Sequence, residues 1–395
     1  MSYQAAISRM YALGHELAQS PSRKFDLAHM RMLLSALDNP ERRFPAVLIA
    51  GTNGKGSTAA TLAAIMQAAG LSTGLYTSPH LIRINERIRI NGEAVSDDSF
   101  AMLHDNVVNP LISVITDISL DHQKFLGDTV GEIAREKAGI IRHGGVVVTL
   151  PQQPQANDVI GNAILEAGAR GISAVPYVPP VSPLSQEYAT VSFPGAVPVE
   201  RYPLQVMGEQ ITIESPLIGR HQLRNLALAI TTSAELARQG FPVTARSIET
   251  GVRNTHWSGR FQVLPVGDSR PQFVFDAAHN PAGAWALRST LSTLYEGKRL
   301  IFVFGVMRDK AMGEITEILF PLAERVILTQ AENPRSATPD EIRRSTRVLG
   351  DFEETASVQA AIEQAQDLAG VDGTVVVTGS IYLVGEAMNQ LGIKV

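Results

Sequence analysis

Residues 44–58 read FPAVLIAGTNGKGST, and this stretch decides the fold. Phe44–Ala50 is a short apolar run that ends at a glycine, as the buried strands of parallel sheets do. The alanine-rich segment 57–69 has a high helix propensity, stops at Gly70 and precedes a strand that we expect from Ser72. A strand, a glycine-rich loop, a helix and a strand in this order are typical of the start of a parallel α/β domain.

The rest of the chain repeats this alternation. Strand-like runs alternate with helical stretches such as 128–141, 221–239 and 282–296, which predicts an α/β fold with doubly wound parallel sheets. The segment Pro176–Pro216 holds eight prolines and short alternating runs, so we expect a small antiparallel β insertion there. Asn254–Gly259 (NTHWSG) interrupts the pattern and predicts a domain boundary. The strand-like runs lie at 111–118, 145–150, 271–277, 299–306, 325–330 and 373–379.

Composition excludes several classes of protein. The 395 residues carry 34 Lys and Arg against 39 Asp and Glu, a formal charge of −5 with no basic block, which argues against nucleic-acid binding. The absence of cysteine excludes disulfides, a thiolate zinc site and a cysteine nucleophile, and it fits a reducing cytoplasm. The N-terminus has no apolar signal core and no long apolar run follows, so we expect a soluble cytoplasmic protein that does not bind membranes.

The loop between the first strand and helix predicts a phosphate site. Its glycines allow a tight turn whose amides point at phosphate oxygens, Lys55 can reach the β and γ phosphates, and Ser57 can ligate Mg²⁺. The loop departs from a strict Walker A motif, because Ile49 replaces its first glycine and Gly56 replaces the hydroxyl residue after the lysine. The alternative is a glycine-rich turn with an incidental lysine. The expected nucleotide-binding residues are Gly51, Thr52, Asn53, Gly54, Lys55, Gly56, Ser57 and Thr58.

The spelling GTNGKGS resembles the ATP loop of the Mur ligase superfamily, in its folylpolyglutamate synthase and dihydrofolate synthase branch. Eight further motifs follow in the order of that family and span most of the chain. They are YTSPHL (76–81), NERI (85–88), ITDISLDH (115–122), EKAGII (136–141), GRHQLRN (219–225), GRF (259–261), DAAHNP (276–281) and GVMRDK (305–310).

The resemblance implies a two-domain enzyme. Residues 1–256 would form a P-loop ATP domain with the β insertion, and residues 257–395 a Rossmann-like glutamate-ligase domain. Such ligases phosphorylate a carboxylate with ATP and Mg²⁺, and the amine of L-glutamate then attacks the acyl phosphate. Because no protein nucleophile is needed, catalysis rests on positioning and charge neutralisation. The expected substrates are folate or dihydropteroate and L-glutamate, bound by a monomer.

The resemblance also assigns roles to individual residues. Lys55, His122 and Lys137 match catalytic positions, with Lys137 matching a lysine that is carbamylated in the family. Ser57, Ser78 and His122 match metal or phosphate ligands. Asn225 matches the residue that reads the adenine, Arg260 and Asp276 match phosphate and ribose contacts, and His279 lies near the same edge. Thr77, Ser78, Pro79, His80 and the early segment Phe25-Asp26-Leu27 match the folate side, and Asp309 and Lys310 match a loop at the cleft.

Simpler roles remain open for several of these residues. Magnesium prefers oxygen ligands, so His122 would on chemistry alone be as well explained as a buried or hydrogen-bonded histidine. Lys137 could form helix ion pairs, since GEIAREKAGI favours them. Asp309 and Lys310 could form a surface ion pair, and Phe25 could be a core residue.

The chain departs from the family pattern between residues 92 and 111. A helix and a sheet strand are missing there, and with them the family glutamate that bridges two magnesium ions; Asp97, Asp98 and Asp105 fit a polar helix start better. Either the polypeptide lacks the segment, or the natural protein has a stretch absent from this sequence at Asp105–Asn106. The second is favoured, because removing an interior strand would expose buried faces.

Two other functions compete with a folate ligase. A non-catalytic relative could have kept the ATP loop and lost the bridging carboxylate. A cell-wall ligase of the Mur type is the other, and the GTNGKGS and TSPHL spellings disfavour it.

Overall fold

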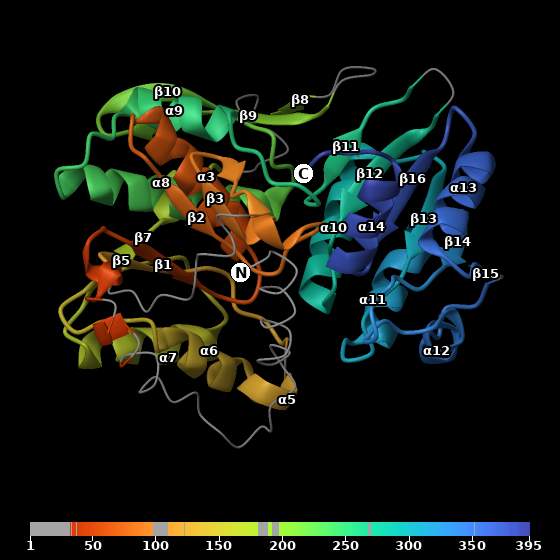
Figure 1. Ribbon diagram of the computed structural model, residues 1–395, viewed down its shortest axis with the longest axis horizontal. Coiled ribbons are helices and arrows are strands. Elements are labelled where there is room, and N and C mark those ends of the chain that lie inside the picture. Colours follow the sequence, from red (N-terminus) through yellow and green to blue (C-terminus); the bar gives the residue numbers. More distant parts are fainter. Residues whose placement is uncertain are drawn as a thin grey trace.

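The computed structural model describes residues 32, 34–36, 38–97, 110–121, 123–180, 189–191, 197–267, 270–350 and 352–395. Two α/β units lie side by side, one built by the N-terminal two thirds of the chain and one by the C-terminal third (Figure 1). Four predictions fall outside the described residues: the segment Phe25–Leu27, the metal ligand His122, the carboxylates Asp98 and Asp105, and the junction Asp105–Asn106.

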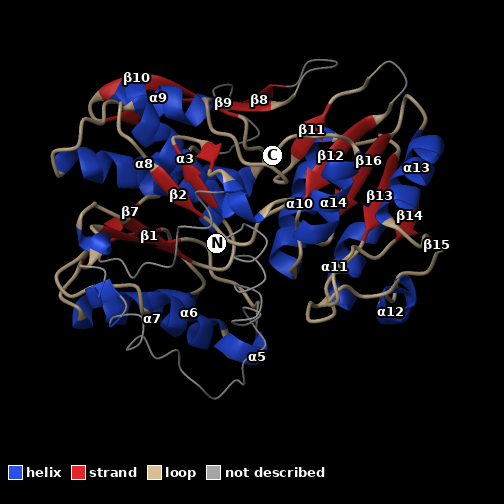
Figure 2. Cartoon of the chain, in the orientation of Figure 1, coloured by secondary structure: helices blue, strands red, loops and turns tan. Residues whose placement is uncertain are grey.

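The first unit is built on a parallel sheet in the order β1-β5-β6-β7. Helices cover both faces of this sheet (Figure 2). Ile112 and Val114 of β5 pack in one core with α3 and α8, and Ile115 packs on the opposite side with α6 and α7. The strands are β1 (Val47–Ala50), β5 (Ile112–Ile115), β6 (Val146–Thr149) and β7 (Arg170–Ser173), and the helices are α3 (Lys55–Ala68), α5 (Gln123–Leu126), α6 (Val130–Ala138), α7 (Pro154–Glu166), α8 (Arg220–Arg238) and α9 (Ala245–Arg253).

The strand expected after α3 exists, and the β-loop-α-β order along the chain is as predicted, but this strand does not join the parallel sheet. β2 (Gly74–Tyr76) pairs antiparallel with β3 (Ile88–Ile90), which pairs with β4 (Glu93–Ala94), in a separate sheet. A central parallel strand needs apolar side chains on both faces, whereas Gly74 and Tyr76 of β2 are exposed. Within the described residues β1 therefore lies at the edge of its sheet, and its first three residues are only half-buried.

The predicted antiparallel insertion is confirmed. β8 (Ala189–Val191), β9 (Val199–Val206) and β10 (Glu209–Ser215) form an antiparallel sheet in the order β10-β9-β8. Met207 and Gly208 both have positive φ, 53° and 88°, as a two-residue hairpin turn that matches the strand twist requires.

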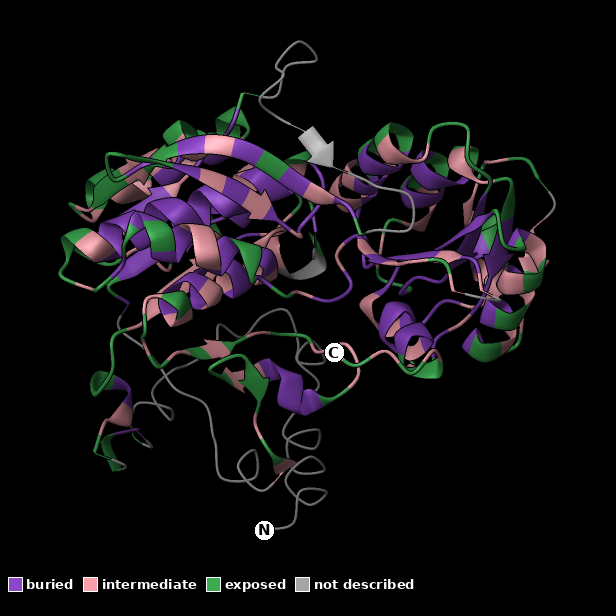
Figure 3. Cartoon of the chain, turned by 90° about the horizontal axis from the view of Figure 1, so that it is seen from above, coloured by how far each residue is buried: buried purple, intermediate pink, exposed green. Residues whose placement is uncertain are grey.

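The second unit is built on a six-stranded sheet in the order β11-β12-β16-β13-β14-β15, parallel except for β11. Phe302 and Phe304 face a core with α10, α11 and α12, whereas Ile301 and Val303 face α13 and α14. Figure 3 shows these central strands as buried. The strands are β11 (Gln262–Leu264), β12 (Gln272–Asp276), β13 (Leu300–Phe304), β14 (Arg325–Leu328), β15 (Glu353–Glu354) and β16 (Thr374–Thr378), and the helices are α10 (Pro281–Leu294), α11 (Met312–Leu319), α12 (Pro339–Ser345), α13 (Val358–Ala369) and α14 (Ile381–Gln390).

The predicted fold class is confirmed, and the carboxyl edges of the two parallel sheets face a common junction between the units. The loops after β12 and β13 leave the carboxyl edge of their sheet, where ligands of open α/β sheets bind. They contact the loops after β1 and β5 through the side chains of Asn280 and Lys310. Separately, no helix in the described ranges is long and apolar enough to cross a bilayer.

Candidate active site

The backbone of the glycine-rich loop is hydrogen-bonded to the segment that follows β5. The amides of Thr52 and Asn53 donate to the carbonyl of Asp117, at 2.8 and 3.2 Å, which ties the loop to the end of β5. Gly54 has φ 88°, and a Cβ there would lie 2.1 Å from Oδ1 of Asn225. The turn therefore requires glycine at position 54 both for its backbone conformation and for the contact with α8.

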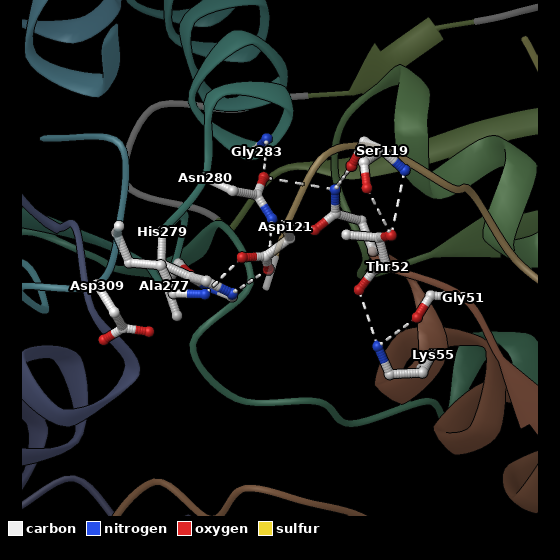
Figure 4. A network of polar contacts seen from close by, with 12 residues as sticks. Gly51, Thr52, Lys55, Ser119, Asp121, Ala277, His279, Asn280, Gly283 and Asp309 are labelled. Carbon is white, nitrogen blue, oxygen red and sulfur yellow. Dashed lines mark hydrogen bonds and ion pairs between the residues drawn. The ribbon is translucent and has the colours of Figure 1, made fainter. Parts of the chain in front are cut away.

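Lys55 turns its ammonium group back onto this loop. Its Nζ donates to the carbonyls of Gly51 and Thr52, both at 2.8 Å (Figure 4). Burial, together with the neighbouring charges of Lys137, Arg260 and Lys310, lowers the pKa of Lys55 to about 8, although Asp121 acts in the opposite direction. A cation held in place against carbonyl oxygens is ready to exchange these for phosphate oxygens.

The cations whose charges act on Lys55 come from separate segments of the chain. Lys55 begins α3, Lys137 lies in the last turn of α6, Arg260 lies in the linker between the units, and Lys310 lies in the loop after β13. Burial lowers the pKa of Lys137 as well, with Asp121 and Glu136 acting against it. Such a concentration of positive charge around amide donors fits a polyanionic ligand.

Asp121 is the carboxylate that joins the two units. Its Oδ1 accepts from Nζ of Lys310 at 2.6 Å, and both side chains are 7% exposed. Its Oδ2 accepts from Nδ2 of Asn280 at 3.3 Å and lies 3.7 Å from Nε2 of His279. Figure 4 shows all of these groups, apart from Lys310, pointing into the space beside the glycine-rich loop.

Asn280 extends this network to the loop itself. Its Nδ2 donates to Oδ1 of Asn53 at 3.0 Å, and Asn53 in turn donates to Oγ of Ser119 at 3.1 Å. The Oδ1 of Asn280 accepts from the amide of Gly283 and caps α10. The start of α10 is thus fixed against the phosphate loop of the other unit.

Arg260 in the linker and the buried Asp276 at the end of β12 carry opposite charges that act on each other. Burial lowers the pKa of Arg260, and the charge of Asp276 acts in the opposite direction. Burial likewise raises the pKa of Asp276, partly offset by Arg260 and by the amides of Phe261 and Ala278. These two amides donate to Oδ2 and Oδ1 of Asp276, each at 2.9 Å. Asp276 therefore anchors the linker to the end of β12 and keeps Arg260 at the loop.

Asn225 lies on the first turns of α8, against the glycine-rich loop. Its Nδ2 donates to Oε1 of Gln222 at 2.9 Å, and its backbone carbonyl accepts from Oγ1 of Thr58 at 3.4 Å. The start of α8 has no capping side chain of its own. Instead, the buried Glu200 of β9 accepts from the amide of Gly219 at 2.9 Å, so the β insertion fixes the helix that carries Asn225.

Residues 77–80, predicted on the folate side, form the connection between β2 and η2 (Ile84–Arg87). The amide of Thr77 donates to the carbonyl of Arg87 at 2.8 Å, and Nδ1 of His80 accepts from Nε of the same arginine at 3.1 Å. Ser78 and Pro79 are exposed. Leu81, next along the chain, packs on the second unit so closely that a Cβ on Gly385 of α14 would lie 2.1 Å from its carbonyl oxygen.

Asp309 and Lys310, predicted together, point to different partners. Lys310 is buried on Asp121, whereas Asp309 accepts from Nη2 of Arg335 at 3.0 Å. For Asp309, burial raises the pKa, but the hydrogen bond and charge of Arg335 together with Lys310 outweigh it and leave the pKa below its usual value. The surface ion pair considered from the sequence therefore does not form between these two residues.

The described residues offer few metal ligands. They contain no group of three His, Asp or Glu side chains able to hold a metal ion. Asp97, a candidate replacement for the missing glutamate, accepts from Arg83 at 2.8 Å and from Asn85 at 3.0 Å, away from the loop. Ser57 is buried at the start of α3, beside the predicted phosphate site. Mg²⁺ commonly takes one or two protein ligands and completes its shell with phosphates and waters, so this sparse set fits a nucleotide-bound ion.

Three residues that the structure brings to the loop are not among the predicted site residues. Asp121 and Asn280 lie inside the motifs LDH and HNP, in which the neighbouring His122 was predicted as a metal ligand and His279 as part of the nucleotide site. Trp257 packs its indole against Gly56, where a Cβ would lie 2.4 Å from Cζ2 of the ring. Trp257 lies in NTHWSG, a segment that predicted only a domain boundary and that could have indicated a site residue.

Comparisons with known proteins agree with this architecture. The Mur ligase middle domain family matches residues 49–233, and the family described as Mur ligase, glutamate ligase domain matches residues 259–381. The chain is 27% identical over 422 residues to the dihydrofolate synthase/folylpolyglutamate synthase of Bacillus subtilis, covering 92% of this chain and 94% of that protein. Because this alignment is longer than the 395-residue chain, it contains positions at which the relative has residues and this chain has none.

Solved structures place the whole chain in the same family. Folylpolyglutamate synthase of Mycobacterium tuberculosis complexed with ADP superposes with a TM-score of 0.80 at 26% identity, covering 100% of both chains. A bifunctional folylpolyglutamate synthase/dihydrofolate synthase of Yersinia pestis complexed with AMPPNP and a Mn ion gives 0.77 at 25% identity, again covering 100% of both chains. The resemblance read from the motifs is confirmed, and the chain belongs to the Mur ligase superfamily, in the branch of the folylpolyglutamate and dihydrofolate synthases.

Proposed function

We propose that this protein is an ATP-dependent ligase that joins L-glutamate to folates, and to dihydropteroate, through an acyl phosphate. The observation that carries the proposal is the glycine-rich loop at the start of α3, onto whose carbonyls Lys55 turns its ammonium group while the charges of Lys137, Arg260 and Lys310 act on it. Transfer of a phosphoryl group to a carboxylate brings several negative charges together, and fixed cations stabilise such a transition state.

The chain's residues divide this task between the two units. The amides of the loop and Lys55 would hold the nucleotide phosphates, and Arg260 and Lys310 would bring positive charge from the second unit. Asn225, Asp276 and His279 would complete the nucleotide site, and Thr77, Ser78, Pro79, His80 and Asp309 the folate and glutamate side. His122, Ser57 and Ser78 would hold Mg²⁺, which when bound neutralises phosphate charge.

The wider organisation is part of the same proposal. The ATP domain would end at residue 256 and the glutamate-ligase domain would begin at residue 257, in the linker between α9 and β11. We propose that the protein is a monomer and works in the cytoplasm. The absence of cysteine suits this reducing compartment. The carbamylation of Lys137 is compatible with its lowered pKa, because carbon dioxide reacts with the neutral amine.

The test is folate-dependent release of ADP. The chain is incubated with ATP, Mg²⁺, L-glutamate and either dihydropteroate or tetrahydrofolate, in parallel with Lys55→Ala and with Lys298→Ala. Lys298 is an exposed lysine of the second unit and serves as the matched control. We expect release by the chain and by Lys298→Ala, and none by Lys55→Ala.

The other outcomes separate the alternatives. ADP binding without folate-dependent release would identify a non-catalytic relative. Release with a UDP-muramoyl substrate in place of folate would identify a cell-wall ligase.

A further inference from the structure

Leu81 of the first unit packs on the second unit. It follows directly after residues 77–80, and together with Ile82 it contacts the apolar core that α13 and α14 share with the sheet of the second unit. This contact removes apolar surface from water only while the two units keep their arrangement. Leu81 therefore fastens the chain after residue 80 to the second unit.

Two glycines leave the space that Leu81 occupies. Gly385 lies inside α14, where a Cβ would be 2.1 Å from the carbonyl oxygen of Leu81 and 2.7 Å from its carbonyl carbon. At Gly259 in the linker, a Cβ would be 3.2 Å from Cδ2 of Leu81. Glycine inside a helix is less stable than alanine, so its presence there calls for a packing reason. For Gly385 the reason is the main chain of Leu81, which no change of rotamer can move away.

The carboxylate of Glu86 fixes the same segment to the first unit. Its Oε2 accepts from the amide of Leu81 at 2.8 Å, and its Oε1 accepts from the amide of Ile82 at 2.9 Å. The start of the segment is fixed as well, because the amide of Thr77 donates to the carbonyl of Arg87 at 2.8 Å. Residues 77–82 are thus held between η2 of the first unit and α14 of the second.

We propose that Gly385 is a positioning residue for the folate substrate, because the close contact of α14 with the main chain of Leu81 sets the position of residues 77–80. The inference rests on the proposed function, which places these residues on the folate side, and it adds a support from the second unit. A methyl group at position 385 would push Leu81 away and move the residues between it and Thr77.

The nucleotide loop has different supports. Its amides at Thr52 and Asn53 donate to the carbonyl of Asp117, and the side chain of Asn53 accepts from Asn280. These contacts come from the end of β5 and the start of α10 and not from α14. A displacement of Leu81 should therefore change the binding of folate and leave the binding of ATP unchanged.

The first experiment measures hydrogen exchange of the ligand-free chain by mass spectrometry. For Gly385→Ala we expect the peptide 77–83 to exchange at least about tenfold faster, because Leu81 can no longer dock on α14. Gly161→Ala is the matched control, since Gly161 lies inside α7 and a Cβ there would meet nothing within 4 Å. It should exchange as the unmodified chain does. Unchanged exchange of this peptide in Gly385→Ala would overturn the inference.

The second experiment measures the kinetics of ADP release with tetrahydrofolate, ATP, Mg²⁺ and L-glutamate. For Gly385→Ala we expect the KM for tetrahydrofolate to rise about tenfold, with kcat and the KM for ATP within about twofold of the unmodified chain. A general loss of structure would instead lower kcat and raise both KM values.

Leu81→Ala keeps the inference testable if Gly385→Ala does not fold. It removes the side chain that packs on α14 and leaves the helix itself unchanged, so the KM for tetrahydrofolate should again rise. Leu165→Ala, at an exposed leucine of α7, is the control and should leave both KM values unchanged.

The remaining outcomes separate the inference from the proposed function. If exchange of the peptide 77–83 rises and the KM for tetrahydrofolate does not, the contact holds the segment without positioning the substrate, and the inference is wrong while the function stands. If the unmodified chain releases no ADP in response to folate, the proposed function is wrong. The exchange rates then still decide whether α14 sets the position of the segment.

Discussion

Nζ of Lys310 in the second unit lies 2.6 Å from Oδ1 of Asp121 in the first, and both side chains are 7% exposed. A buried ion pair that loses one partner leaves an uncompensated charge, which costs about 3 to 5 kcal/mol. We therefore expect Lys310→Met to lower the free energy of unfolding by about 3 kcal/mol, somewhat less if Asn280 and His279 compensate Asp121. Denaturant unfolding of the ligand-free chain measures the loss.

A double-mutant cycle tests whether the pair itself is responsible. The combination Asp121→Asn with Lys310→Met should cost less than the sum of the two single changes, because the double variant leaves no charge unpaired. Arg344→Met removes one partner of the exposed Asp340–Arg344 pair and should cost less than about 1 kcal/mol. Additive effects of the first two changes would contradict a direct Asp121–Lys310 interaction.

Gly54 has φ 88° and no room for a side chain beside Asn225. Gly54→Ala imposes a strained backbone and pushes a methyl group onto Oδ1 of Asn225, so we expect ADP affinity to fall by more than about tenfold. The matched control is Gly70→Ala, where φ is 81° and a Cβ would meet nothing within 4 Å. This control carries the backbone strain alone and should cost about 1 kcal/mol of stability with no change in ADP affinity. Calorimetric titration with ADP compares the two variants.

Burial holds the pKa of Lys55 near 8 in the ligand-free protein. Phosphate oxygens beside Nζ would favour its charged form and raise that pKa, so nucleotide binding above pH 8 should take up a proton. ADP affinity should then fall by up to about tenfold per pH unit above pH 8. Titrations at about pH 9 in two buffers of different ionisation enthalpy give the number of protons, and Lys55→Met should lose the uptake.

The lowered pKa of Lys55 also makes the free energy of unfolding depend on pH. The unfolded chain binds a proton at Lys55 up to its ordinary pKa of 10.5, whereas the folded chain releases it near 8. Between these values the unfolded state binds more protons, so the contribution of Lys55 to the free energy of unfolding rises with pH. Equal slopes for the chain and for Lys55→Met across this window would show that the lysine is not shifted.

The strands and helices were predictable because their apolar runs are long and interrupted by glycine and proline. The sheet that holds β2 was not, since a three-residue strand carries too little pattern to indicate its partner. The residues of the phosphate loop, 51–58, were predictable because they follow one another in the sequence. Asp121, Asn280 and Trp257 were not, because their function depends on contacts with distant segments, such as Asn53 with Asn280, which are 227 positions apart.

The last prediction concerns Asp276, whose two carboxylate oxygens each accept a hydrogen bond from a backbone amide. Asp276→Asn keeps one acceptor and turns the other into a donor that faces the amide of Phe261 or Ala278, and it removes the negative charge beside Arg260. We expect a loss of about 2 kcal/mol of stability and a lower rate of ADP release, because the linker is no longer fixed. The exposed Asp372→Asn is the control and should behave as the unmodified chain. If both variants unfold at the same denaturant concentration, Asp276 does not anchor the linker.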